Sequence, residues 1–159
     1  MHVDLPDAAA TEQFGRRLAA ALTRTHGPAL VIALRGPLGA GKTTLVRGVL
    51  RALGHAGRVR SPTYTLLEPY RLDGRPIAHV DLYRVADPRE LEFLGIGDQL
   101  VPGGILLVEW PERGGDRLPP GDLELQLEYA GDGRRLAVAA LSPAGERLLA
   151  HLPEAPAEA

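Results

Sequence analysis

A phosphate-binding loop is the feature that most constrains the fold of this chain. Residues 36–43 are Gly-Pro-Leu-Gly-Ala-Gly-Lys-Thr, which satisfies the pattern G-x-x-x-x-G-K-[ST]. Glycines allow such a loop to curl around a phosphate, so that successive backbone N–H groups point inward as donors. The lysine of this pattern, here Lys42, reaches the β- and γ-phosphates, and the hydroxyl of Thr43 is a ligand for Mg²⁺. The chain contains a single lysine, and it stands at this position.

The sequence on either side of the loop has the order that the motif requires. Before the loop, residues 29–34 form an apolar run, which predicts a strand buried on both faces. After it, leucine and valine recur at helical spacing up to Leu53, and Gly54 ends the pattern. A glycine-rich turn that matches by chance would not need these flanking elements. The predicted phosphate-binding residues are Gly36, Leu38, Gly39, Ala40, Gly41, Lys42, Thr43 and Thr44.

Length, charge and composition narrow the class of protein. The 159 residues fit one domain, which we assign to residues 1–152, with 153–159 as a disordered tail. The net charge of −2 argues against strong direct binding to nucleic acid or to an anionic membrane. The absence of cysteine excludes disulfides and thiolate metal sites. No apolar stretch is long enough to span a bilayer and the N-terminus lacks a signal-peptide pattern, so we expect a cytoplasmic protein.

Hydrophobic periodicity and turn residues predict the remaining elements. Asp73-Gly74 is typical of a β-hairpin turn. Residues 123–129 alternate strictly between apolar and polar, which predicts a half-solvated antiparallel strand. We therefore expect an α/β fold, a P-loop NTPase-like sheet that is parallel at the nucleotide site, with antiparallel edge hairpins and flanking helices. The expected elements are a helix over 8–25 capped by Asp7 or Thr11, hairpin strands over 64–71 and 76–83, a short helix after Asp87-Pro88, a strand over 104–108, a proline- and glycine-rich connection over 113–121, hairpin strands over 123–129 and 135–140, and a helix over 144–152.

Two acidic residues at predicted strand ends are candidates for a magnesium and catalytic site. Glu109 follows the apolar residues 105–108, which is the Walker B pattern with glutamate in place of the usual aspartate. Asp81 shares one strand face with His79 and Tyr83, because side chains alternate along a strand. Either acid could approach the metal ion or polarise the attacking water, and a solvated acid at a strand end is the alternative for each. The predicted metal ligands are Thr43, Glu109 and Asp81.

A threonine-containing segment lies between the loop helix and the first predicted hairpin. Residues 61–65 are Ser-Pro-Thr-Tyr-Thr, at the place where switch-type hydrolases have a threonine that senses Mg²⁺ and the γ-phosphate. A plain turn restricted by Pro62 is an equal alternative. The predicted catalytic residues are thus Asp81, Glu109 and Thr63. Trp110, the only tryptophan, could stack near the nucleotide, belong to a partner surface or pack internally.

The nucleotide itself is expected to be ATP. Guanine-specific proteins commonly carry an Asn-Lys-x-Asp element, and the lone lysine of this chain is already in the phosphate loop. No arginine can be assigned from the sequence as an arginine finger, although Arg84, Arg58 and Arg60 are internal candidates.

Four blocks of the sequence together resemble the TsaE (YjeE) family, small ATPases of bacterial threonylcarbamoyladenosine tRNA modification. The blocks are residues 36–44, 61–65, 79–84 and 108–112, and the resemblance extends over nearly the whole chain up to the second predicted hairpin. Pro37 departs from the family, which more often has aspartate there. Because that side chain is not required for phosphate contact, we expect nucleotide binding to survive.

The resemblance implies ATP and Mg²⁺ as ligands, with Lys42 and Thr43 at the phosphates and metal ion and with Thr63, Asp81 and Glu109 as the switch and acidic residues. It implies ATP hydrolysis in support of two partner proteins, TsaB and TsaD. TsaD transfers threonylcarbamoyl to adenosine 37 of tRNAs that read codons beginning with adenine. Turnover by the isolated chain is expected to be weak.

Two other functions stay open at this point. A small-molecule kinase would share the loop and the fold, but it usually needs an arginine-bearing lid. The sequence shows no lid segment, although residues 113–117 could be mistaken for one. A nucleotide-gated interaction module would bind ATP with negligible hydrolysis.

Overall fold

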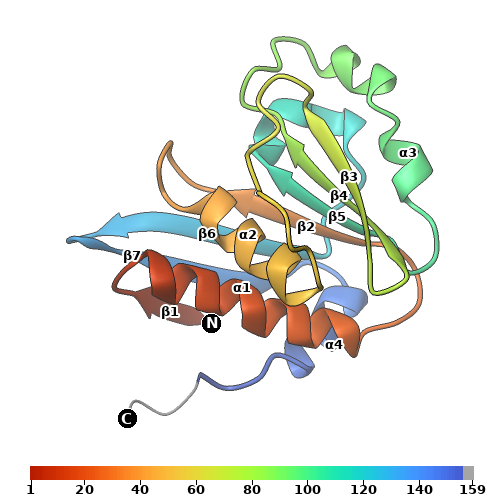
Figure 1. Ribbon diagram of the computed structural model, residues 1–159. Helices are drawn as coiled ribbons and strands as arrows, with labels where there is room; N and C mark the ends of the chain where they lie inside the picture. The colour runs from red at the N-terminus through yellow and green to blue at the C-terminus, as the bar shows by residue number, and fades with distance from the viewer. Residues whose placement is uncertain (156–159) are drawn as a thin grey trace.

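The computed structural model describes residues 1–155, which form one mixed sheet with helices packed on both faces (Figure 1). The sheet has seven strands in the order β1-β7-β6-β2-β5-β4-β3. The strands are β1 (His2–Leu5), β2 (Leu30–Arg35), β3 (Leu67–Leu72), β4 (Arg75–Asp81), β5 (Ile105–Glu109), β6 (Leu123–Ala130) and β7 (Gly133–Ala140). The α-helices are α1 (Ala8–Thr23), α2 (Lys42–Ala52), α3 (Ile96–Gln99) and α4 (Pro143–Ala150), with 3₁₀ segments η1 (Pro88–Phe93) and η2 (Pro111–Arg117).

The middle of the sheet is parallel, as the sequence predicts. β2 pairs in parallel with β5 on one side and β6 on the other, and β4 pairs in parallel with β5. The outer pairs, β1 with β7 and β3 with β4, are antiparallel. The carboxyl ends of β2, β4 and β5 therefore meet at one edge of the sheet, where ligands bind in open α/β sheets.

Apolar side chains form a core on each face of the sheet. The larger core lies between the sheet and α1, α2 and α4, and it includes Phe14, Ile32 and Leu50. The smaller core lies on the opposite face, where Leu91 of η1 and Ile96 of α3 cover residues such as Val80. Figure 1 shows α1 and α2 side by side across the first of these faces. No helix within residues 1–155 combines the length and apolar character needed to cross a membrane.

Several predicted boundaries need correction. The strand expected over 64–71 begins at Leu67, because residues 63–65 form a turn, and its partner ends at Asp81 rather than 83. β6 is antiparallel to β7 as predicted, but it is also parallel to β2, so it lies inside the sheet and not at its edge. The short helix after Asp87 is a 3₁₀ segment, and the expected connection over 113–121 begins within another.

Two elements were not predicted at all. β1 has only four residues, too few for a period to show, and its pairing with β7 holds it in place. The single turn of α3 is equally short. The predicted tail lies mainly outside the described residues. Within them, the carbonyl of Pro153 accepts hydrogen bonds from Arg17 Nη2 and Nε at 2.7 and 3.0 Å.

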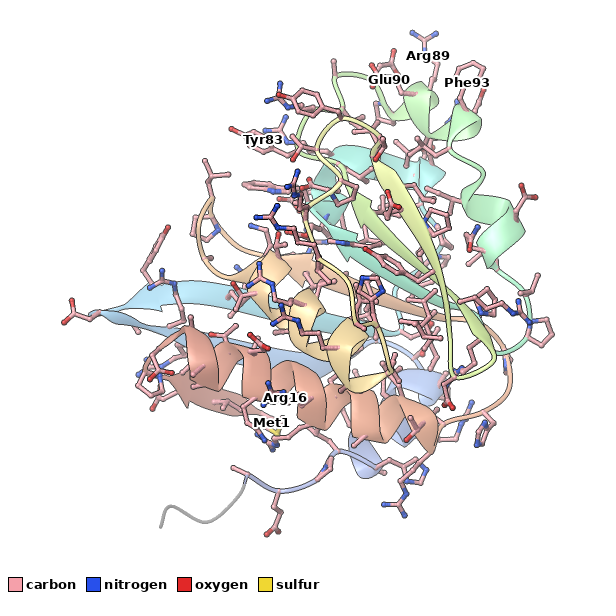
Figure 2. The ribbon with its side chains drawn as sticks, in the orientation of Figure 1. Met1, Arg16, Tyr83, Arg89, Glu90 and Phe93 are labelled. Atoms are coloured by element: carbon pink, nitrogen blue, oxygen red, sulfur yellow. The ribbon has the colours of Figure 1, made fainter. Side chains whose placement is uncertain are left out.

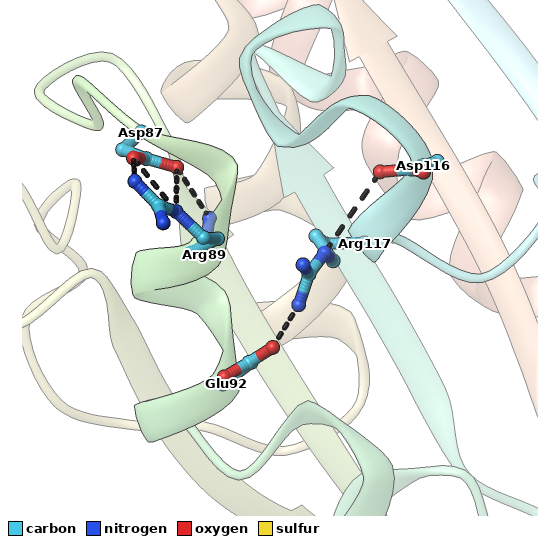
Figure 3. A network of polar contacts seen from close by, with 5 residues as sticks. All are labelled: Asp87, Arg89, Glu92, Asp116 and Arg117. Carbon is cyan, nitrogen blue, oxygen red and sulfur yellow. Dashed lines mark hydrogen bonds and ion pairs between the residues drawn. The ribbon is translucent and has the colours of Figure 1, made fainter.

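The 3₁₀ segments that follow β4 and β5 are joined by an ion pair between two side chains (Figure 3). Arg117 of η2 pairs with Glu92 of η1. Asp87 caps η1 by accepting from the backbone N–H of Arg89 at 2.9 Å, and its carboxylate also pairs with that guanidinium at 2.6 Å. The Arg117–Glu92 pair thus joins the chain segments that leave the two strands carrying the candidate acids, while the Asp87–Arg89 contacts stabilise the start of η1.

Candidate nucleotide-binding site

The phosphate loop connects the end of β2 to the first residue of α2. Three of its glycines have positive φ, which is 147° at Gly36, 77° at Gly39 and 104° at Gly41, a region that disfavours other residues. Gly41 is the N-cap of α2 and provides no capping side chain. The first N–H groups of the helix are therefore left for a ligand at the positive end of its dipole.

A cavity of about 410 Å³ lies over the loop. All the predicted phosphate-binding residues except Gly36 line it, as do the predicted catalytic residues Thr63, Asp81 and Glu109. Gly36 does not line the cavity, and a Cβ atom on it would approach the carbonyl oxygen of Leu127 to 2.6 Å. Its role is to let the chain turn closely past β6. The structure thus brings the predicted site residues together at one end of the sheet.

The ammonium group of Lys42 is held inside this site. Its Nζ donates to the carbonyl oxygens of Gly36 at 2.6 Å and Pro37 at 3.0 Å, and it lies 4.2 Å from the ring centroid of Trp110. Only 4% of the residue is exposed. Burial lowers the pKa of Lys42, while the nearby carboxylates, Glu109 first, act in the opposite direction. Trp110 packs on the lysine and also lines the cavity, while its stacking near a nucleotide stays a prediction.

Glu109 is the most constrained acid of the site. It is 3% exposed, and both of its carboxylate oxygens lie 3.0 Å from the hydroxyl of Thr43, the second residue of α2. On its other side, Nε2 of the fully buried His79 lies 2.6 Å from Oε2 of Glu109. Because an ionised carboxylate only accepts, His79 donates through Nε2. Its Nδ1 is buried without a hydrogen-bond partner among the described residues.

Asp81 connects the site to the segment 61–65. It is the neighbour of Glu109 in the register of β4 and β5, so the two acids lie side by side. One of its oxygens accepts from the hydroxyl of Ser61, and the other accepts from the backbone N–H of Tyr83 at 2.9 Å. Thr63 also lines the cavity, and its hydroxyl lies 3.4 Å from the carbonyl oxygen of Ser61. The segment predicted to act as a switch is thus anchored to a candidate metal ligand.

The oxygen atoms of this site fit Mg²⁺ bound together with a phosphate. Thr43, Asp81 and Glu109 offer a hydroxyl and two carboxylates, the hard donors that Mg²⁺ prefers. Within residues 1–155 no three histidine, cysteine, aspartate or glutamate side chains are arranged to hold a metal ion by themselves. In the usual Mg²⁺ site of nucleotide enzymes, one or two carboxylates are completed by substrate phosphates and water.

Aromatic rings and arginines form the rim of the cavity. Tyr83 and Trp110 are in contact, with ring centroids 5.0 Å apart, and the guanidinium of Arg113 lies over both rings. Figure 2 shows Tyr83 at the end of the sheet where β4 finishes. Arg84 lines the cavity and covers the exposed ring of Tyr64, with 4.9 Å between guanidinium carbon and ring centroid.

Of the three candidate arginines, only Arg84 lies at the main cavity. Arg58 and Arg60 line a neighbouring pocket of about 350 Å³, which shares the wall formed by Ser61 and Thr63. The sequence prediction missed the roles of Ser61 and His79, although both belong to the sequence blocks that pointed to the site. It also missed Tyr129 and Arg134, which contact the loop from the β6–β7 hairpin and have no local pattern that marks them.

Comparison with known proteins gives consistent matches over most of the chain. The family model described as threonylcarbamoyl adenosine biosynthesis protein TsaE matches residues 5–137, a range that includes the loop and both acids. A Haemophilus influenzae protein named tRNA threonylcarbamoyladenosine biosynthesis protein TsaE is 44% identical over 146 residues, covering 91% of this chain and 92% of that protein. A Bacillus subtilis protein of the same name is 39% identical over 108 residues, or 68% and 67% of the two chains. The crystal structure of Bacillus subtilis YdiB is similar with a TM-score of 0.74 and 30% identity, covering 96% of this chain and 93% of that one.

Proposed function

We propose, from the premise that this chain belongs to the TsaE family and takes part in tRNA threonylcarbamoyladenosine biosynthesis, that its own contribution is the binding and hydrolysis of ATP. The observation that carries the proposal is the position of Glu109. This buried acid bonds to Thr43 at the start of α2 and faces the cavity that Lys42 also lines. A phosphate loop alone would support binding. A buried acid fixed against the loop threonine supports Mg²⁺-dependent phosphoryl chemistry.

The residues of the site divide this work between them. The loop N–H groups and Lys42 bind the phosphates of ATP. The base is taken to be adenine because the Asn-Lys-x-Asp element of guanine-specific proteins needs a lysine, and the single lysine is in the phosphate loop. Thr43, Asp81 and Glu109 hold Mg²⁺, which when bound neutralises charge that develops on the phosphates. The two acids also orient and polarise the attacking water. Thr63, anchored through Ser61 and Asp81, responds to the γ-phosphate.

Turnover is proposed to depend on the partner proteins TsaB and TsaD, in the modification of adenosine 37. Arg84 is the one candidate arginine at the main cavity, and its guanidinium is stacked on the exposed ring of Tyr64. Without an arginine finger, the isolated chain lacks a stabilisation of the transition state that is worth about 10³–10⁵ in rate. We therefore expect slow hydrolysis alone and faster hydrolysis with the partners present.

The test is reconstitution of tRNA threonylcarbamoylation with and without this protein. Lys42→Ala is expected to abolish ATP-dependent activity, whereas Asp81→Ala and Glu109→Ala are expected to lower turnover more than ATP affinity. Arg51→Ala is a matched control, because Arg51 lies near the other end of α2 and pairs with Glu12 away from the cavity. Modification sustained over many turnovers without the protein, or full activity of the Lys42 variant, would refute the proposal.

The same preparation separates the two alternative functions. Release of inorganic phosphate with no acceptor present supports a hydrolase. Stoichiometric transfer of the phosphoryl group to a small molecule would instead identify the protein as a kinase. An interaction module predicts that Glu109→Ala leaves the overall modification rate unchanged while ATP and ADP still alter partner binding.

A further inference from the structure

The β6–β7 hairpin holds the phosphate loop through two residues that do not line the cavity over it. Tyr129, near the end of β6, donates from its hydroxyl to the carbonyl oxygen of Leu38 at 2.5 Å. Arg134, near the start of β7, donates from Nη2 to the carbonyl oxygen of Gly39 and from Nε to that of Ala40, both at 3.2 Å. Three successive loop carbonyls are therefore bound by two side chains that lie far away in the sequence.

The two side chains also support each other. The guanidinium carbon of Arg134 lies 4.4 Å from the ring centroid of Tyr129, and Nη1 of Arg134 donates to the carbonyl oxygen of Gly133 at 2.8 Å. This contact fixes the plane of the guanidinium, and a planar fork can bond two neighbouring carbonyls only when that plane is fixed. Together with the bonds from Lys42 to the carbonyls of Gly36 and Pro37, every loop carbonyl from residue 36 to residue 40 accepts from a side chain.

Bonds to the carbonyls determine where the N–H groups point. In a trans peptide the C=O of one residue and the N–H of the next point in opposite directions. When Tyr129 holds the carbonyl of Leu38, the N–H of Gly39 is turned away from the hairpin. When Arg134 holds the carbonyl of Ala40, the N–H of Gly41 is turned away in the same manner. Both glycines line the cavity over the loop, so N–H groups that are turned away from the hairpin carbonyl bonds are available to phosphates bound there.

Packing holds Ala40, which is fully buried in the larger core, but it constrains Gly39 and Gly41 on either side much less, because glycine has no side chain to pack. Residues 39–41 also border a second cavity of about 260 Å³, on the side of α1 and the hairpin turn. A glycine peptide beside open space can rotate at low cost, because no side chain resists the change in φ and ψ. The hydrogen bonds from the hairpin, together with the bond from the N–H of Ala40 to the carbonyl oxygen of Pro37 at 3.1 Å, hold one orientation of these peptides.

We propose that Tyr129 and Arg134 are positioning residues that orient the N–H groups of Gly39 and Gly41 for polyphosphate binding. The inference rests on the proposed function, because it assumes that the loop binds a nucleotide. Neither side chain needs to touch the ligand. Tyr129 is 55% exposed and its hydroxyl has no part in either core, so removing that hydroxyl leaves the fold intact.

The test compares Tyr129→Phe and Arg134→Met with two matched controls. Tyr70→Phe removes the hydroxyl of a partly buried tyrosine that does not contact the loop, and Arg135→Met removes the next arginine of β7, which pairs with Asp4 at 3.2 Å. Affinities for Mg²⁺·ADP and for adenosine are measured by calorimetry or by the fluorescence of Trp110. The loss of one hydrogen bond predicts about 5-fold weaker ADP binding for Tyr129→Phe, and the loss of two predicts about 10- to 50-fold for Arg134→Met.

Three readouts separate orientation of the loop from general damage. Adenosine affinity and the melting temperature are expected to stay at the wild-type values in both variants. Arg134→Lys keeps the charge but not the fork, so wild-type ADP affinity in that variant would reduce the effect to electrostatics and overturn the proposal. Equal ADP affinity in Tyr129→Phe, Arg134→Met and the controls would also overturn it, and Tyr129→Phe alone decides if the Arg134 variants do not fold. If the unaltered protein binds no ADP, the proposed function fails first.

Discussion

The crossing of α1 and α2 gives a prediction whose size follows from the structure. The two helices meet through glycines, and a Cβ atom placed on Gly48 of α2 would lie 2.2 Å from the carbonyl oxygen of Glu12 in α1. On the other side of the crossing, a Cβ on Gly15 would lie 2.3 Å from the carbonyl oxygen of Leu45. Both obstacles are backbone atoms, which cannot turn aside as a flexible side chain can.

The change Gly48→Ala has two opposing effects on stability. Alanine favours the helix by about 1 kcal/mol over glycine. Restoring an ordinary contact of at least 3.4 Å requires α2 to move about 1 Å away from α1, and overpacking of this kind costs typically about 1–3 kcal/mol, occasionally more. We expect the upper part of that range because backbone meets backbone, so the net destabilisation is about 1–2 kcal/mol. At about 2–4 °C per kcal/mol, the melting temperature falls by about 2–8 °C.

The displacement is also expected to reach the site. Lys42 and Thr43 are the first residues of α2, so they move with the helix. A shift of about 1 Å in a positioned group can cost about 100-fold in rate, and we expect ATP hydrolysis to fall by about 10- to 100-fold.

Urea unfolding and steady-state phosphate release measure the two effects. Gly97→Ala in α3 is the matched control, because a Cβ there meets no atom within 4 Å. We expect that control to be neutral or stabilised by up to about 1 kcal/mol. Wild-type stability and activity in Gly48→Ala would show that the helices adjust without cost and would refute the reasoning.

Three further predictions concern single groups. His79→Leu is expected to lower kcat for ATP hydrolysis with little change in KM, because Glu109 loses its hydrogen bond from the imidazole. His79→Gln is expected to restore part of the rate because its amide can donate, and equal kcat in the wild type and both variants would contradict this. Asp122→Ala leaves the buried N–H of Val31 without its 2.8 Å partner and should destabilise the protein by about 1–3 kcal/mol in urea unfolding, a loss that Asp122→Asn should partly avoid. Burial raises the pKa of Tyr70, so this tyrosine ionises in the unfolded chain at a lower pH than in the folded protein, and the free energy of unfolding falls as the pH rises above about 10. Tyr70→Phe should lose less stability in that range. Parallel curves of unfolding free energy against pH for the two proteins would exclude the effect.

The predictable part of the fold depends on local patterns. β2 and β5 are apolar runs buried on both faces, and the glycine, lysine and threonine of the loop stand at fixed spacing between β2 and α2. The hairpin turn at Asp73-Gly74 likewise lies where the two residues predict it. Where pairing between distant segments decides the outcome, prediction fails. The alternation of residues 123–129 is that of a strand with one buried face, and it holds whether the strand ends the sheet or, as β6 does, lies between β2 and β7.

The candidate site shows the same division on the two sides of one loop. On the cavity side, glycine spacing, the lysine and the strand-end acids predict the site, because each chemical role there needs a particular residue type. On the other side, the loop presents backbone carbonyls, which every residue carries, so nothing in residues 36–43 specifies what must bond to them. Tyr129 fits an alternating strand and Arg134 fits the end of a hairpin turn, and only the fold places them, 91 and 94 residues away in the sequence, against Leu38 and Ala40. A chain with the same loop motif but without this hairpin must therefore orient its phosphate-binding N–H groups with other donors.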